Sequence, residues 1–137
     1  MGTYINNARV LRSDNKKDIF VENGVYPFII PNNIDPTETF PVRKGTVMAM
    51  SSVTKLIVRY VNGGTNGAGT PIGMLYEDAI QPADILLYGG SPIAIMASVV
   101  RHGIAFVADD YLNMDSAAKT ALALLGLYVH TPTGEGV

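Results

Sequence analysis

The sequence contains no cysteine, so disulfide bonds and thiolate metal sites are excluded. It also lacks any uninterrupted apolar run near the roughly 20 residues that a membrane-spanning helix needs, and we expect no membrane partner. Basic residues are in no excess, because ten Lys and Arg stand against twelve Asp and Glu. A nucleic-acid-binding surface requires clustered Lys and Arg, so we expect no nucleic-acid partner. No basic segment followed by an apolar stretch opens the sequence, and no secretion signal is expected.

What the chain does have is a high apolar content. Hydrophobic residues make up 47% of its 137 positions and charged residues only 16%. This is too apolar for a disordered protein, and the length suits one domain with one core. Apolar strands that a small domain cannot cover alone are commonly covered by copies of itself, so we expect a homo-oligomer.

The first 40 residues differ in character from the rest. Residues 1–24 are polar and rich in Asn, and their apolar residues do not recur at a helical spacing. Residues 25–41 carry four prolines at intervals of four or five, which predicts neither a helix nor a central strand. We therefore expect residues 1–40 to be an extended N-terminal arm, either mobile or laid on a partner, and residues 41–137 to be the folded domain. Whether residues 25–30 add a strand to that domain stays open.

From Val42 onward the sequence is typical of a β fold. Short apolar and β-branched runs are separated by turn signals such as Ser51-Ser52 and Gly89-Gly90. The runs that we expect as strands are GTVMAMSS (45–52), KLIVRYVN (55–62), PIGMLYEDA (71–79), ADILLYGG (83–90) and SPIAIMASVV (91–100). Strands so short and so closely spaced predict a curled sheet or a small, partly open barrel. The run IAIMASVV is continuously apolar, so this strand is expected to be covered on both faces or to lie against another subunit.

One segment predicts a helix. In MDSAAKTALALLG, Asp115 or Ser116 can cap the N-terminus and Gly126 can end the helix. The apolar stripe on one face has i, i+3, i+4, i+7 spacing and consists of Ala118, Ala121, Leu122 and Leu125. A last short strand, LYVH, is expected at residues 127–130. The predicted fold class is therefore mostly β with one C-terminal helix.

The segment GGTNGAG, residues 63–69, raises the question of a phosphate site. A P-loop needs a lysine after its glycines and a helix behind it, but no Lys or Arg lies between Arg59 and Arg101 and an apolar strand follows. The dinucleotide spacing also fails, because Ile72 stands where a third glycine is required. We interpret the segment as a flexible hairpin loop.

Few residues suggest catalysis. His102 and His130 stand apart, no G-x-S-x-G motif is present, and we interpret both as structural. The acidic pairs Glu77-Asp78 and Asp109-Asp110 fall at apparent strand ends, where adjacent side chains point to opposite faces and do not converge. We predict no catalytic residue, no metal and no cofactor. Two alternatives stay open, a small β-barrel hydrolase using Asp109 or Asp110 with His102, and a ligand-binding β module with the glycine loop as its lid.

The order of these signals from Pro41 onward resembles one known family. The matching stretches are VRKGTVMAM as the opening strand, KLIVRYVNGG before the glycine-rich loop, GTPIGMLYEDA as the return strand, VVRHGIAFVADDYLNM before the helix, and DSAAKTALALLGLYV as the closing helix and strand. This pattern is similar to that of the lambda-type phage head decoration proteins, also called capsid cement or stabilisation proteins.

The resemblance implies a β-clip, or bent-ribbon, domain that associates as a homotrimer. Such trimers are assembled in the host cytoplasm and sit on the outer surface of an expanded phage capsid, which they brace against the pressure of packaged DNA. The implied partner is the major capsid protein, to which the N-terminal arm adds a strand. On this basis the candidate capsid contacts of the arm are Tyr4, Ile5, Val10 and Leu11. The resemblance implies a structural protein of the virion and not an enzyme.

Overall fold

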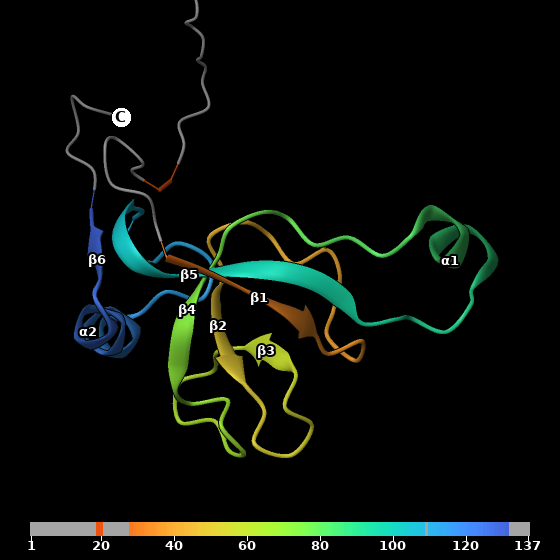
Figure 1. The fold of residues 1–137 in the computed structure, drawn as a ribbon, viewed down its shortest axis with the longest axis horizontal. Helices are drawn as coiled ribbons and strands as arrows, with labels where there is room; N and C mark the ends of the chain where they lie inside the picture. Colours follow the sequence, from red (N-terminus) through yellow and green to blue (C-terminus); the bar gives the residue numbers. More distant parts are fainter. Residues whose placement is uncertain (1–18, 21–27, 109, 132–137) are drawn as a thin grey trace, which may run out of the picture.

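Six β-strands and two α-helices form the described part of the chain, which the computed structural model gives as residues 19–20, 28–108 and 110–131 (Figure 1). In chain order they are β1 (Phe28–Ile34), β2 (Val47–Met50), β3 (Ile57–Arg59), β4 (Pro71–Leu75), α1 (Ala83–Tyr88), β5 (Ile95–Phe106), α2 (Ser116–Leu125) and β6 (Leu127–His130). The predicted mostly β fold is confirmed, as is the helix near the C-terminal end with a short strand directly after it.

Five of the strands close into a barrel. They are hydrogen-bonded in the order β1-β3-β2-β4-β5, and β5 pairs again with β1. The sequence predicts a partly open barrel, but the barrel is closed because β5 is 12 residues long and has partners on both edges. Its residues 95–102 run antiparallel to β1, while Val99 and Val100 pair with β4. β6 lies outside the barrel and pairs in parallel with residues 103–106 of β5.

β1 lies within the proline-containing segment that the sequence predicts as part of an extended arm, and Phe28–Ile34 answers the open question of whether a strand of the barrel begins there. The strand pairs with β5 along its length but with β3 at one position only, where Ile34 is opposite Ile57. Pro31 sits in the middle of β1, where the second edge of the strand has no partner among the described residues. A proline at such an edge need not cost a ladder hydrogen bond. Residues 28–30 thus belong to the barrel, and residues 25–27 lie outside the described residues.

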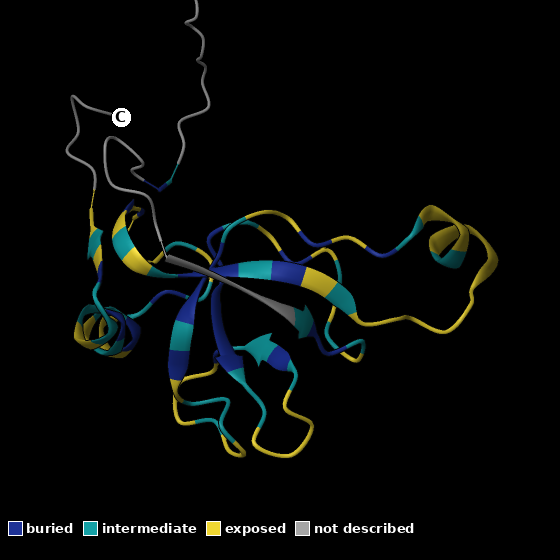
Figure 2. Cartoon of the chain, viewed as in Figure 1, coloured by how far each residue is buried: buried dark blue, intermediate teal, exposed yellow. Residues whose placement is uncertain are grey.

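The core has two apolar layers, one on each face of the barrel wall. The inner cluster takes residues from all five barrel strands and so fills the barrel. Its buried members are Ile34, Val42, Met48, Ile57, Leu75, Ala79, Ala97 and Val99. The outer cluster joins the wall to α2 and β6, and it includes Val47, Ala49, Met74, Val100, Ala118, Leu122 and Leu127. Successive strand residues point to opposite faces, which is why β2 contributes to both clusters and is buried over most of its length (Figure 2).

α2 begins and ends where its sequence predicts. Asp115, one of the two candidate caps, is the N-cap, and its side-chain oxygen accepts a hydrogen bond from the Ala118 N–H at 2.7 Å. The same carboxylate accepts a hydrogen bond from the Tyr60 hydroxyl at 3.0 Å, which ties α2 to the residue after β3. Burial, and then this contact with Asp115, raise the pKa of Tyr60 above its usual value. Gly126 ends the helix in the left-handed conformation, at φ 102°.

α1 replaces one of the predicted strands. The run ADILLYGG contains a six-residue helix that follows Pro82 and ends at Gly89 in the left-handed conformation. A short apolar run has too few residues for its periodicity to separate a strand from a helix. Proline before the first helical residue and glycine after the last are helix-boundary signals, and both are present here. The described residues therefore contain two helices where the sequence predicts one.

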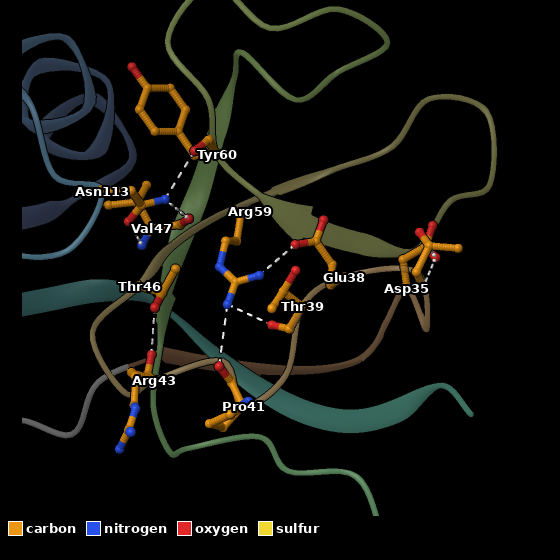
Figure 3. Close-up of polar contacts among 11 residues, drawn as sticks. Asp35, Glu38, Thr39, Pro41, Arg43, Thr46, Val47, Arg59, Tyr60 and Asn113 are labelled. Carbon is orange, nitrogen blue, oxygen red and sulfur yellow. Dashed lines mark hydrogen bonds and ion pairs between the residues drawn. The ribbon is translucent and has the colours of Figure 1, made fainter. Parts of the chain in front are cut away.

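Polar contacts hold the loop between β1 and β2 against the barrel (Figure 3). Arg59 on β3 donates a hydrogen bond to the Glu38 carboxylate at 2.9 Å. It also donates to the carbonyl oxygens of Thr39 and Pro41, at 2.7 and 3.3 Å. One arginine thus joins three positions of a loop that has few apolar side chains to bury.

Asn113 joins the turn before α2 to the barrel wall (Figure 3). Its side-chain oxygen accepts a hydrogen bond from the Val47 N–H at 2.8 Å. Its amide nitrogen donates to the carbonyl oxygens of Val47 and Tyr60, at 2.8 and 3.0 Å. Val47 is fully buried, so water cannot replace these partners. The asparagine therefore gives partners to the Val47 N–H and the Tyr60 carbonyl, and it is a second donor to the Val47 carbonyl, which also accepts from the Tyr60 N–H.

We predict that Asn113→Ala lowers the free energy of unfolding by about 1–3 kcal/mol, because it leaves the buried Val47 N–H without its acceptor. Urea denaturation followed by circular dichroism measures the change. The matched control is Asn62→Ala, at an exposed position after β3, which should alter the free energy of unfolding by less than about 0.5 kcal/mol. Equal unfolding midpoints for the two variants would contradict this role of Asn113.

Candidate functional site

The four arm residues predicted to contact a capsid, Tyr4, Ile5, Val10 and Leu11, lie outside the described residues, as does the catalytic candidate Asp109. Within the described ranges, no three His, Cys, Asp or Glu residues are grouped closely enough to hold a metal ion. Neither helix of the described chain has the length and apolar character to cross a bilayer. The site therefore has to be sought among the exposed and recessed surfaces of the barrel domain.

The remaining acidic candidates do not converge on one point. The Asp78 carboxylate accepts a hydrogen bond from the backbone N–H of Lys44 at 2.6 Å, which joins the end of β4 to the turn before β2. Its neighbour Glu77 is exposed, and Asp110 is exposed in the turn between β5 and α2. The position of Asp78 is thus accounted for by a structural hydrogen bond, without a catalytic role.

The two histidines contact the C-terminal part of the fold. The His130 ring on β6 lies with its centroid 5.6 Å from that of Phe106 on β5. The His102 ring lies so close to Gly126 that a Cβ added there would be 2.5 Å from the ring. Both contacts join β5 to the α2–β6 segment, and both histidines are exposed.

The glycine-rich segment is not a hairpin loop, because β2 lies between β3 and β4 in the sheet. The segment packs on the end of β2, where the Ser52 N–H donates a hydrogen bond to the Asn66 carbonyl at 2.8 Å. The N–H groups of Gly64 and Ala68 donate to carbonyl oxygens within the same loop. These two N–H groups already have acceptors and are not available to an anion. With no Lys or Arg between Arg59 and Arg101 to accompany it, the segment is interpreted as a structural loop.

A large exposed apolar surface belongs to the connection between β4 and β5, residues 76–94, which we call the excursion. It carries α1 at its tip, at the end of the molecule remote from α2 (Figure 1). No residue of α1 is buried, and the exposed fractions of Leu86, Leu87 and Tyr88 are 63%, 74% and 84% (Figure 2). Ile80 and Ile93 add to this surface on either side of the helix. Clustered apolar exposure of this kind marks an interaction site.

Gln81 closes the base of the excursion. Its side chain is buried, and its amide nitrogen donates a hydrogen bond to the Ile93 carbonyl at 2.8 Å. Its side-chain oxygen accepts a hydrogen bond from the Ile93 N–H at 3.1 Å. One amide thus satisfies both backbone groups of Ile93, and it joins the two ends of the excursion where no strand ladder does. No sequence pattern identifies this clamp, because a single glutamine carries no periodicity.

An apolar cavity of about 350 Å³ reaches from the inner cluster, whose Ile57 and Val99 line it, to Leu125 of α2. Its lining residues are Met50, Ile57, Thr70, Pro71, Ile72, Val99, Arg101 and Leu125. Arg101 is the only charged residue among them, and within the described chain its guanidinium has neither a hydrogen bond nor an ion pair. A cavity of this size, apolar except for Thr70 and Arg101, suits a small ligand or the side chains of a partner.

No protein-family model and no curated protein sequence matches this chain. The resemblance to capsid decoration proteins therefore stays a prediction from the order of sequence signals. The function has to be argued from the surfaces described above, of which the excursion and the cavity are the two that lack a partner within the described chain.

Gly67 and Gly63 form a matched pair within the glycine loop, because both have left-handed φ values, 90° and 75°. A Cβ at Gly67 would overlap the carbonyl oxygen of Met50, whereas a Cβ at Gly63 meets no atom within 4 Å. We predict that Gly67→Ala lowers the free energy of unfolding by about 1–3 kcal/mol more than Gly63→Ala. Thermal unfolding in a calorimeter measures both. Indistinguishable losses would mean that the loop does not pack on the end of β2.

We predict that Gln81→Ala loosens the excursion and leaves the barrel folded. Chymotrypsin should then cleave after Leu86, Leu87 or Tyr88 several-fold faster, because cleavage requires local opening. Mass spectrometry of the fragments locates the cut. Gln81→Glu keeps the shape and an acceptor oxygen but loses the N–H donor, so its cleavage rate should fall between those of the other two proteins. The clamp is refuted if wild type and Gln81→Ala are cleaved equally fast.

Proposed function

We propose that this protein is a structural virion protein that binds the outside of an expanded phage capsid as a homotrimer and stabilises the shell against the pressure of packaged DNA. Its proposed partners are two further copies of the chain and the major capsid protein. In this role the domain is a β-clip, or bent-ribbon, variant of a small β-barrel. The protein acts through buried contact area and added backbone hydrogen bonds, without a bond-making step.

The observation that carries this proposal is the exposed apolar surface of the excursion. Leu87 and Tyr88 project from the tip of a loop that Gln81 braces at its base. Met96, at the start of β5, is 65% exposed, whereas Val99 and Val100 are both buried, so the continuously apolar run of this strand is covered on both faces only toward its end. An isolated domain gains no stability by projecting apolar side chains into water, whereas a protein that joins neighbouring copies buries them. The surface therefore favours a role in assembly.

The N-terminal arm supplies the second attachment in this proposal. Residues 1–24 combine a polar background with short apolar groups, among them Tyr4, Ile5, Val10 and Leu11. Such a segment suits strand addition, in which backbone hydrogen bonds give affinity and alternate side chains enter pockets of the partner. A trimer presents three arms at once, so weak individual contacts combine through a high effective concentration.

We predict that deleting residues 1–24 abolishes co-sedimentation with expanded capsids of the phage that encodes the chain. The oligomeric mass, measured by light scattering, should stay the same, because the arm is assigned to the shell and not to the contacts between copies. A variant with serine at all four anchor positions should lose capsid binding as well. The matched control, with serine at Asn6 and Asn7, should bind normally. Undiminished capsid binding by the truncated protein would refute the arm as the attachment.

A further inference from the structure

We infer that α1 of one copy docks into the apolar cavity of a neighbouring copy, where Asp84 pairs with Arg101. This inference rests on the self-association in the proposed function but not on capsid binding. It gives one partner to two features that have none within the described chain, an apolar helix that projects from the barrel and an apolar cavity in its wall.

Charge is the first argument for this pairing. Asp84 is the only charged residue between positions 79 and 100, and its exposed carboxylate accepts a hydrogen bond from the adjacent Ile85 N–H. Arg101 is the only charged residue of the cavity lining, and no described residue pairs with it. One acid within an apolar projection thus matches one base within an apolar cavity. Such complementary charges fix the register of a contact between proteins.

The distance between helix and cavity within one molecule requires that the helix come from another copy. Figure 1 places α1 at the end of the molecule remote from α2, and Leu125 of α2 lines the cavity. The Gln81 clamp also joins the two ends of the excursion, which limits how far the helix can swing. Each copy carries one such helix and one such cavity, so a second copy can supply the helix that the first copy cannot bring to its own cavity.

Helix and cavity are both apolar, so bringing them together removes water from both surfaces. A cavity of about 350 Å³ corresponds to roughly a dozen water molecules. Leu86 and Leu87 can displace this water from walls formed by residues such as Met50 and Ile72, and the gain grows with the apolar area buried. Helix and cavity are different surfaces of the chain, so the contact is heterologous and closes into a trimer only where the rotation between copies is three-fold.

Charge reversal tests both sides of the contact. Asp84→Arg and Arg101→Asp each bring like charges together, so each should raise the dissociation constant of self-association on the order of tenfold or more. The double variant restores an opposite pair and should regain the wild-type constant. Asp110→Arg, at an exposed position outside the excursion and the cavity lining, is the matched control. Sedimentation equilibrium measures the constants, and circular dichroism shows whether each variant is folded.

The inference is overturned if either single variant associates like wild type, if the double variant fails to recover, or if the wild-type protein is a monomer. Octanoate, an anion with an apolar tail, should compete with the helix for the cavity. The inference is equally overturned if octanoate occupies the cavity of the wild-type protein and the oligomeric mass is unchanged. Failure of the proposed function has a different appearance. If self-association depends on these charges but the protein does not bind expanded capsids, the inference stands and the proposed capsid role is refuted.

Discussion

The pairing of β5 on both of its edges is the constraint on which the rest of the fold depends. One edge holds β1, the other holds β4, and the last residues of the strand hold β6 outside the barrel. Gly73 on β4 shows how close this pairing is, because a Cβ added there would overlap the carbonyl oxygen of Val100. Closure then separates an inner from an outer apolar layer, and the outer layer is what α2 covers.

The same pairing shows that the excursion is longer than the topology requires. β4 and β5 are antiparallel neighbours, and a connection between such strands needs only about two to five residues. The chain instead uses residues 76–94, adds α1 and braces the base with Gln81. A long connection with its own secondary structure in a small domain is commonly functional. This is a reason, independent of exposure, to assign the contact between copies to this segment.

The sequence predicts the parts of this fold whose signals are local. Asp115 and Gly126 mark the ends of α2 by their own backbone preferences, and the β-branched runs mark the strands. Closure is not predictable in this way, because it joins Ile34 to Ile95 across most of the domain and involves a strand whose proline argues against it. The residues of the candidate site are even harder to predict from the sequence. The Gln81 clamp and the position of Arg101 in the cavity wall arise from tertiary contacts that leave no periodicity in the chain.

The two proposed attachments differ in what binding costs. A braced excursion is largely ordered before it meets a neighbour, so little conformational entropy is lost when α1 is buried. In the proposed capsid contact, strand addition would fix the backbone of every residue that joins the shell, and each of these residues would cost conformational entropy. On the proposed function, we therefore expect copies to associate through the excursion before they meet the shell. The proposed oligomer would then offer several arms to the capsid, and their combined effective concentration would offset the entropy cost of each contact.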